Sequence, residues 1–239
     1  MDLLIDDCMK DELCASAFPD LRRDFDKVLA DLREKPASFS LEGETIVLTY
    51  EVFAERLRLM LYDLPSASRI PSMINQAARN NWIPFAVAAL ARSRQSANLL
   101  SMGMYFTVTC SESVPTITDA DIERETSGTF VGSYRTKVHQ RACAEWPRAQ
   151  ITDAYYQPVR SNVPVLIFSG MLDPATPPNL AAAAAKYLPN SRIVTIRNAA
   201  HGYSSPCLQS IAIDFIAAGS ATDLDTACVD TIRRPAFVR

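Results

Sequence analysis

Residues 163–202 constrain the fold of this chain more than any other stretch. Two apolar, β-branched runs, VPVLIFSG and RIVTIRN, lie on either side of a helix-like segment, NLAAAAAKYL. Buried parallel strands read as continuous apolar runs, and two parallel neighbours need a crossover connection, usually a helix. The pattern therefore predicts a strand–helix–strand unit of a parallel sheet, and an α/β fold class.

Each apolar run is followed by a polar residue that can do chemistry. Asp173 comes just after the first run, and His201 just after the second. The carboxyl ends of parallel strands are where ligands and catalytic groups gather in open α/β sheets. A single crossover brings both loops to the same edge, where Asp173 could orient His201 as a general base. The alternative is an ordinary Asp-Pro turn and an ordinary loop histidine.

A serine nucleophile in its usual setting is not found in the sequence. α/β-Hydrolases carry the serine in a G-x-S-x-G turn, followed in chain order by Asp and His. The one glycine pair with that spacing is Gly128 and Gly132, and Phe130 stands at the serine position. Ser133 and Ser169 are the weaker candidates for a nucleophile inside this chain.

Composition excludes several functional classes. The net charge of −3 gives no electrostatic basis for binding nucleic acid. No apolar run approaches the roughly 18 residues of a membrane span. The acidic start, MDLLIDDCMKDELC, lacks the features of a signal peptide. With two histidines and no C-x-x-C pair, neither a metal site nor a cofactor is expected.

Six cysteines indicate disulfide bridges. An even count allows three bridges in several connectivities, among which the sequence does not choose. Closeness in the chain favours Cys8–Cys14 and Cys207–Cys228, which leaves Cys110–Cys143; six buried, reduced thiols are the alternative. Bridges would indicate an oxidising compartment, although the chain shows no export signal of its own.

The first 150 residues have the pattern of short helices rather than of buried strands. Helices are expected over residues 21–35, 50–62, 70–79, 84–92, 119–125 and 133–145. SFSLEGETIVLT predicts a β-hairpin that turns at Glu42-Gly43, and SMGMYFTVTC fits a strand as well as a helix. We therefore expect a mostly helical cap or lid region in residues 1–150, followed by an α/β segment in residues 151–239.

Local signals in the second region place two more helices. Thr176 is expected to cap the helix that starts at Pro177-Pro178, and Ser205 to begin the last one. The last helix should pack behind the His201 loop through an apolar stripe of Leu208, Ile211, Ala212, Phe215 and Ile216. The other histidine, His139, is predicted to lie on the surface.

Several segments together resemble the C-terminal region of tripeptidyl aminopeptidase-like (TAP-like) α/β-hydrolases, relatives of the proline iminopeptidases. They are VPVLIFSGMLDPATPP, NSRIVTIRNAAHG and PCLQSIAIDFIAAG with a later cysteine. In that family SG-x-x-D-x-x-TP carries the catalytic aspartate and N-A-A-H-G the catalytic histidine, which implies those roles for Asp173 and His201. FPDLRRDF and FTVTCSESVP resemble the helical cap that these enzymes insert before their last two strands.

The resemblance implies a partial α/β-hydrolase fold: a helical cap followed by the last strand–helix–strand–helix of the sheet. It also implies a serine peptidase that releases N-terminal residues or short peptides, acting on a peptide or a small amide or ester. Full-length relatives are secreted or periplasmic and carry the serine upstream of this region. The chain alone is therefore expected to be inactive, unless a second chain supplies the N-terminal half.

Two further expectations follow. A two-stranded sheet should expose an apolar edge near residues 165–168. An exopeptidase must bind a free ammonium group, for which Glu112 is the candidate and Glu145 the second choice, the alternative being that both are solvated surface acids. The competing hypothesis for the whole chain is a non-catalytic remnant or split-gene product that binds a peptide or a partner.

Overall fold

The computed structural model describes the backbone of residues 1–239 and all side chains except those of residues 96, 97 and 99. It consists of two compact units, each described here by itself. Unit 1 comprises Met1–Ala15, Leu61–Arg69 and Gln157–Arg239, and unit 2 comprises Ser16–Met60 and Ile70–Tyr156. The division of the sequence into domains near residue 150 stays a prediction.

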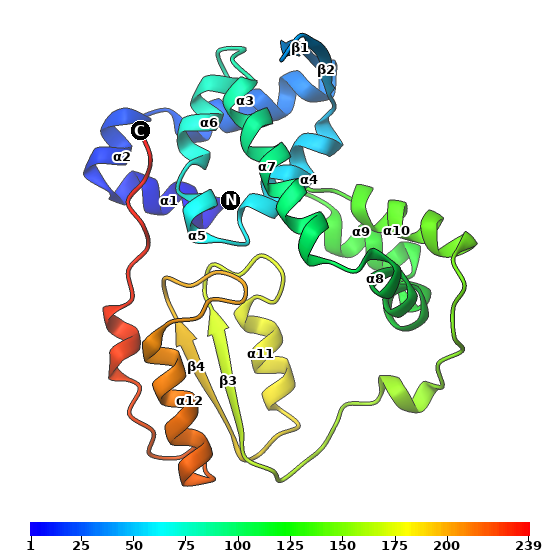
Figure 1. Ribbon diagram of the computed structural model, residues 1–239, viewed down its shortest axis with the longest axis vertical. Helices are drawn as coiled ribbons and strands as arrows, with labels where there is room; N and C mark the ends of the chain where they lie inside the picture. The colour runs from blue at the N-terminus through cyan, green and yellow to red at the C-terminus, as the bar shows by residue number, and fades with distance from the viewer. The chain divides into compact units, whose positions relative to one another are not determined.

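Unit 2 is mostly helical (Figure 1). Its α-helices are α3 (Leu21–Glu34), α4 (Tyr50–Met60), α6 (Ile70–Ala77), α7 (Ile83–Leu99), α8 (Met102–Val108), α9 (Asp119–Thr126) and α10 (Tyr134–Glu145). Short π and 3-10 turns cover Thr109–Ser113, Val114–Thr116 and Asp153–Tyr156. All six helices expected from the sequence in this region are present.

The predicted hairpin is confirmed as β1 (Ala37–Leu41) paired antiparallel with β2 (Glu44–Leu48). Both turn residues have positive φ angles, 51° at Glu42 and 84° at Gly43. Two-residue turns of this kind match the twist of the flanking strands, and glycine adopts the left-handed conformation without steric cost.

The ambiguous run at 101–110 is a helix because one of its faces packs on α10. Phe106 and Cys110 are four residues apart and so lie on the same helical face. The ring centroid of Phe106 is 5.4 Å from that of Trp146, which follows α10, and Cys110 is bridged to Cys143 of α10. These tertiary contacts decide what the local pattern left open.

Unit 1 contains the predicted strand–helix–strand unit, whose two strands lie between α11 and α12 (Figure 1). Its elements are α1 (Asp2–Lys10), α5 (Leu64–Ala67), β3 (Val165–Gly170), α11 (Pro178–Ala185), β4 (Ser191–Ile196), α12 (Pro206–Ala218) and a 3-10 turn at Ala227–Thr231, while α2 (Glu12–Ala17) spans the boundary between the units. β3 and β4 pair in parallel, from Val165 opposite Ser191 to Gly170 opposite Ile196. The chain therefore combines helices with two small sheets.

The core of unit 1 forms where α12 packs on the sheet. Leu208 and Ile211 are buried against Ile196 and Ala199, with Leu166 of β3 and Phe215 of α12 at the margin of the cluster. The predicted stripe is wrong at Ile216, which is 76% exposed. Two strands offer α12 a narrow surface, so a residue at the margin of the stripe finds nothing to pack against. Ser205 caps the helix as predicted, accepting a hydrogen bond from the backbone N–H of Leu208.

The outer edge of β3 is free within the part of the chain that the structure describes. β3 pairs with β4 alone there, and Phe168 remains 37% exposed. This confirms the expected apolar edge near residues 165–168. An unpaired strand edge is a template for pairing with another strand. No helix among the described residues is long and apolar enough to cross a membrane.

Both bridges favoured by closeness in sequence, Cys8–Cys14 and Cys207–Cys228, are present, and so is the remaining pair, Cys110–Cys143. Their sequence separations are 6, 33 and 21 residues. The alternative of six reduced thiols is wrong, because no cysteine is free.

Removing the bridges one at a time should destabilise the protein in the order of loop length. A closed loop restricts the unfolded chain, so paired Cys→Ala substitutions are expected to cost about 4 kcal/mol at Cys110–Cys143, about 3 at Cys207–Cys228 and about 2 at Cys8–Cys14. Urea unfolding of the three variants measures this order. Equal losses at all three bridges would contradict the loop-length argument.

Candidate active site

Asp173 and His201 lie together, beyond the carboxyl ends of β3 and β4. Nδ1 of His201 is 3.0 Å from Oδ2 of Asp173 and 3.1 Å from Oδ1. The Asp173 side chain is 7% exposed, whereas that of His201 is 41% exposed. A buried carboxylate thus holds one side of an imidazole that reaches solvent, the juxtaposition that a single crossover predicts.

Gly170 lets the two loops approach closely enough for this contact. A Cβ atom at Gly170 would lie 2.5 Å from the carbonyl oxygen of Ala199, closer than real Cβ contacts allow. The same carbonyl accepts a hydrogen bond from Leu172 N at 3.0 Å, and Met171 N donates to the carbonyl of Ile196 at 3.0 Å. Backbone contacts between the two segments therefore fix the separation of Asp173 and His201.

The Asp173 carboxylate is surrounded by hydrogen-bond donors. Oδ1 accepts from the backbone N–H groups of Ala175 at 2.7 Å and Thr176 at 2.9 Å, and Oδ2 accepts from the Thr176 hydroxyl at 2.8 Å. Burial by itself would raise the pKa of Asp173, but the Thr176 and Ala175 N–H groups, His201 and the Thr176 hydroxyl outweigh it and hold the pKa below its usual value. The carboxylate stays ionised at neutral pH.

Thr176 has a different role from the one predicted for it. The N-cap of α11 is Pro177, with no side-chain cap hydrogen bond, and the Thr176 hydroxyl donates to Asp173 instead. A threonine hydroxyl can bond either to nearby backbone or to another acceptor, and here an ionised carboxylate within reach is the stronger acceptor.

His201 is oriented for proton transfer through its second ring nitrogen. With Nδ1 facing an ionised carboxylate, the neutral ring carries its proton on Nδ1 and leaves Nε2 as an acceptor. Nε2 has no hydrogen bond to any group that the structure describes. The Tyr62 ring packs against the imidazole, with centroids 5.1 Å apart and planes at 69°. Nothing in the sequence signals Tyr62, which lies far from His201 along the chain.

The lowered pKa of Asp173 predicts how stability depends on pH. Because the folded-state pKa lies below the unfolded value of about 3.9, this carboxylate stabilises the fold above about pH 4, and the stabilisation is lost as pH falls through the folded-state pKa. Urea unfolding of wild type and Asp173→Asn should differ most near neutral pH and converge in acid. A difference that grows as pH falls would show that the sign is wrong.

Glu112, the predicted ligand of an ammonium group, lies in unit 2 within the turn Thr109–Ser113. Its Oε2 accepts a hydrogen bond from the Tyr155 hydroxyl, and this bond raises the pKa of Tyr155. Asp173 and His201 belong to unit 1, so the role of Glu112 stays a prediction. Glu145, the second choice, is exposed at the end of α10.

His139, predicted to lie on the surface, is partly exposed but hydrogen-bonded on both ring nitrogens. Its Nε2 is 2.8 Å from the Tyr105 hydroxyl and its Nδ1 is 2.7 Å from the Arg135 carbonyl oxygen. Arg135 also donates to the Tyr105 hydroxyl at 2.9 Å. This network ties α8 to α10, which local sequence around His139 could not indicate.

Neither serine considered as an internal nucleophile is hydrogen-bonded to His201 in the described structure. Ser169 is 4% exposed on β3, and its hydroxyl finds no partner among the described groups. Ser133 precedes α10 in unit 2. No cluster of three or more His, Cys, Asp or Glu side chains suited to a metal ion occurs among the described residues.

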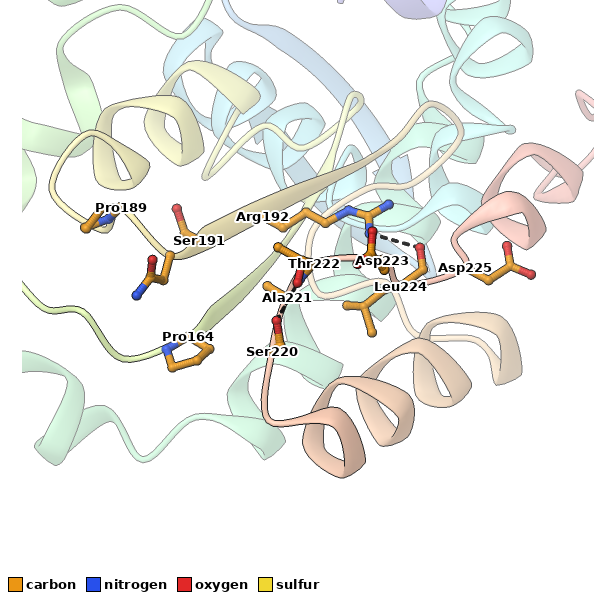
Figure 2. Close-up of a pocket in the computed structure, with 11 residues that line it drawn as sticks. Pro164, Pro189, Ser191, Arg192, Ser220, Ala221, Thr222, Asp223, Leu224 and Asp225 are labelled. Carbon is orange, nitrogen blue, oxygen red and sulfur yellow. Dashed lines mark hydrogen bonds between the residues drawn. The ribbon is translucent and has the colours of Figure 1, made fainter.

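One cavity of unit 1 lies away from the Asp173–His201 pair. It has a volume of about 960 Å³ and lies at the amino ends of the strands, around Pro164 and Ser191 (Figure 2). Arg192 points across it and donates to the Leu224 carbonyl at 2.9 Å and to the Thr226 hydroxyl at 3.2 Å. The arginine fastens the segment after α12, which is a structural role.

A buried aspartate held against a solvent-facing histidine at the ends of two parallel strands is also how the acid and base of α/β-hydrolases are arranged. In agreement, residues 128–228 match the family model described as TAP-like protein. The match covers β3, α11, β4, α12, Asp173 and His201, and it identifies a TAP-like α/β-hydrolase C-terminal region in this chain, as the sequence motifs predicted. No curated protein and no solved structure matches the chain.

Proposed function

We propose that this chain supplies the acid and base residues of a serine hydrolase that cleaves peptides, or small amides and esters, by acyl transfer. The observation that carries the proposal is the hydrogen-bonded pair of Asp173 and His201 at the carboxyl ends of two parallel strands. If the chain acts as the TAP-like aminopeptidases do, the products are N-terminal residues or short peptides.

In the proposed mechanism a serine on a segment outside this sequence attacks the acyl carbon. Nε2 of His201 takes the serine proton as the bond from the serine oxygen to the acyl carbon forms. It later delivers this proton to the departing amine or alcohol as the bond from the acyl carbon to that leaving group breaks. The ionised Asp173 accepts a hydrogen bond from Nδ1–H and stabilises the imidazolium. Water then repeats the sequence on the acyl-enzyme and regenerates the serine. Glu112, and the rest of residues 1–150 as a cap, would bind the substrate.

The free edge of β3 offers the serine-bearing segment a position in the same sheet. A strand that adds to this edge would satisfy the unpaired backbone groups of β3 and cover Phe168. In α/β-hydrolases the nucleophile follows a strand of the same sheet, so such a strand would end on the same side as Asp173 and His201. The three disulfides favour an oxidising compartment, either secreted or periplasmic.

A serine-directed fluorophosphonate probe tests the proposal. The chain alone should remain unlabelled, and a complex with a G-x-S-x-G segment encoded upstream should be labelled on that segment. Labelling of this chain alone, abolished in Ser169→Ala or Ser133→Ala, would replace the proposal with an internal nucleophile.

The second candidate is a binding module without catalysis, which the free edge of β3 also favours. It predicts that the chain pairs with an extended segment yet gives neither labelling nor hydrolysis in the complex. Fluorophosphonate labelling that is lost in His201→Gln would rule out this candidate.

A further inference from the structure

A second cavity of unit 1, of about 310 Å³, lies beside Asp173. Asp173 itself contributes to its wall. The apolar lining comes from three separate parts of the chain: Leu4 of α1, Leu61, Leu64 and Ala67 in and before α5, and Met171 and Leu172 after β3. Its volume falls at the lower end of the range for small-molecule sites, about 300–1,000 Å³, so it has room for one apolar side chain but not for an extended peptide.

One short segment connects this cavity to the imidazole. Leu61, Leu64 and Ala67 face the cavity, and Tyr62 of the same segment contacts His201, with ring centroids 5.1 Å apart. Asp173 and the segment around Tyr62 therefore connect the cavity wall to the imidazole.

The charges around the cavity disfavour an anionic ligand. Asp2, Asp173 and Arg234 are the charged residues in its wall. The Arg234 guanidinium already donates to Oδ2 of Asp7 at 2.8 Å and lies 3.9 Å over the Phe237 ring. An additional carboxylate would lose its hydration beside the ionised carboxylate of Asp173, whereas an uncharged apolar group would meet mainly aliphatic carbon.

We propose that this cavity binds an uncharged apolar side chain of the substrate, of about the size of leucine, and so determines the specificity of the site. The term substrate rests on the proposed function, but binding in the cavity does not. A ligand without this side chain would not bury apolar surface in the cavity, and we expect it to bind about tenfold more weakly or worse.

Methyl NMR of the full chain tests the proposal directly. With ¹³C-methyl-labelled methionine, Met171 reports on the cavity, while Met102 and Met104 of α8 in unit 2 serve as internal controls. N-acetyl-leucinamide should shift the Met171 signal saturably and leave both controls in place. N-acetyl-glycinamide should bind at least tenfold more weakly, and the anion N-acetyl-leucine more weakly than the amide. Equal affinity for the three probes, or no shift at Met171, would overturn the proposal.

Filling the cavity provides the matched variant. Ala67 is 4% exposed and lines the cavity, so Ala67→Leu should abolish the Met171 response. Ala183→Leu adds the same side chain at an exposed position of α11 and should leave it unchanged. If Ala67→Leu does not fold, Leu64→Ala replaces it: the enlarged cavity should reverse the preference, so that N-acetyl-phenylalaninamide binds more tightly than N-acetyl-leucinamide. Unchanged leucine binding in a folded Ala67→Leu protein, or an unchanged preference in Leu64→Ala, would refute the cavity as the binding site.

The outcomes separate this inference from the proposed function. Labelling by fluorophosphonate in the complex with no Met171 response refutes the cavity site and leaves the hydrolase. A saturable Met171 response with no labelling in any complex refutes the hydrolase and leaves a binding site for apolar side chains.

Discussion

Replacing His201 by glutamine in the complex with its serine-bearing segment is expected to lower kcat/KM about 10⁴-fold or more. His201 Nε2 carries no hydrogen bond to a described group, and Nδ1 is held 3.0 Å from Asp173 Oδ2. Nε2 is therefore the ring nitrogen that can accept and donate the transferred proton. Loss of the general base leaves only the rate enhancement that binding and oxyanion stabilisation supply. Hydrolysis of a chromogenic leucine amide under kcat/KM conditions measures the loss.

Asp173→Asn should cause a loss of similar size, about 10⁴-fold, because an amide at this position favours the tautomer with the proton on Nε2. The double variant Asp173→Asn/His201→Gln should lose little more than either single variant, since residues that act as a unit are not additive. Losses that multiply in the double variant would mean that the two residues contribute independently, contrary to the triad proposal.

His139→Gln is the matched control, because it changes the other histidine of the chain. His139 belongs to unit 2 and bonds to Tyr105 and Arg135, so its replacement should alter the unfolding of unit 2 more than the turnover. A drop in kcat/KM as large as that of His201→Gln would show that the assay reports on folding rather than on chemistry.

The strand–helix–strand unit and the Asp173–His201 pair were predictable because only one structure is compatible with the local sequence pattern. Apolar runs at 165–170 and 191–196, separated by a helical segment, can bury both faces only as parallel strands. Once they pair, a residue just beyond each carboxyl end must lie at the same edge, which placed Asp173 near His201. The hairpin at Glu42-Gly43 was equally determined, because few turns have two positive φ angles.

The features that could not be predicted depend on residues that are distant in the chain, or on two acceptors that compete for the same hydroxyl. The Thr176 hydroxyl could cap α11 or bond to Asp173, and only the position of the carboxylate decides between them. Tyr62 reaches His201 because residues 61–69 pack in unit 1, which no periodicity indicates. Ile216 continues the apolar stripe of α12 in sequence, yet the two-stranded sheet is too narrow to cover it.

Gly170→Ala, which adds a single methyl group, should destabilise unit 1 strongly, with an expected loss of about 3 kcal/mol in the free energy of unfolding. The added Cβ would lie 2.5 Å from the Ala199 carbonyl oxygen and 2.9 Å from its carbonyl carbon. Both are backbone atoms, so no rotamer change relieves the clash, and the loop that carries His201 must move. Leu172 N would then lose its hydrogen bond to Ala199, and the Asp173–His201 distance would lengthen.

Gly103→Ala is the control for this prediction, because a Cβ there meets nothing within 4 Å. Gly103 lies inside α8, where alanine is favoured over glycine by about 0.5–1 kcal/mol, so this variant should be neutral or slightly stabilised. Urea unfolding gives the free energies, and the NMR signal of the Nδ1 proton of His201 reports the contact with Asp173. If Gly170→Ala unfolded at the same urea concentration as wild type and kept that proton signal, the close approach of the two loops would not be what positions the pair. Loss of the signal in a folded Gly170→Ala protein would instead explain why the SG and N-A-A-H segments occur together. Gly170 of the first segment would be required because the backbone of the second segment occupies the space that a side chain would need.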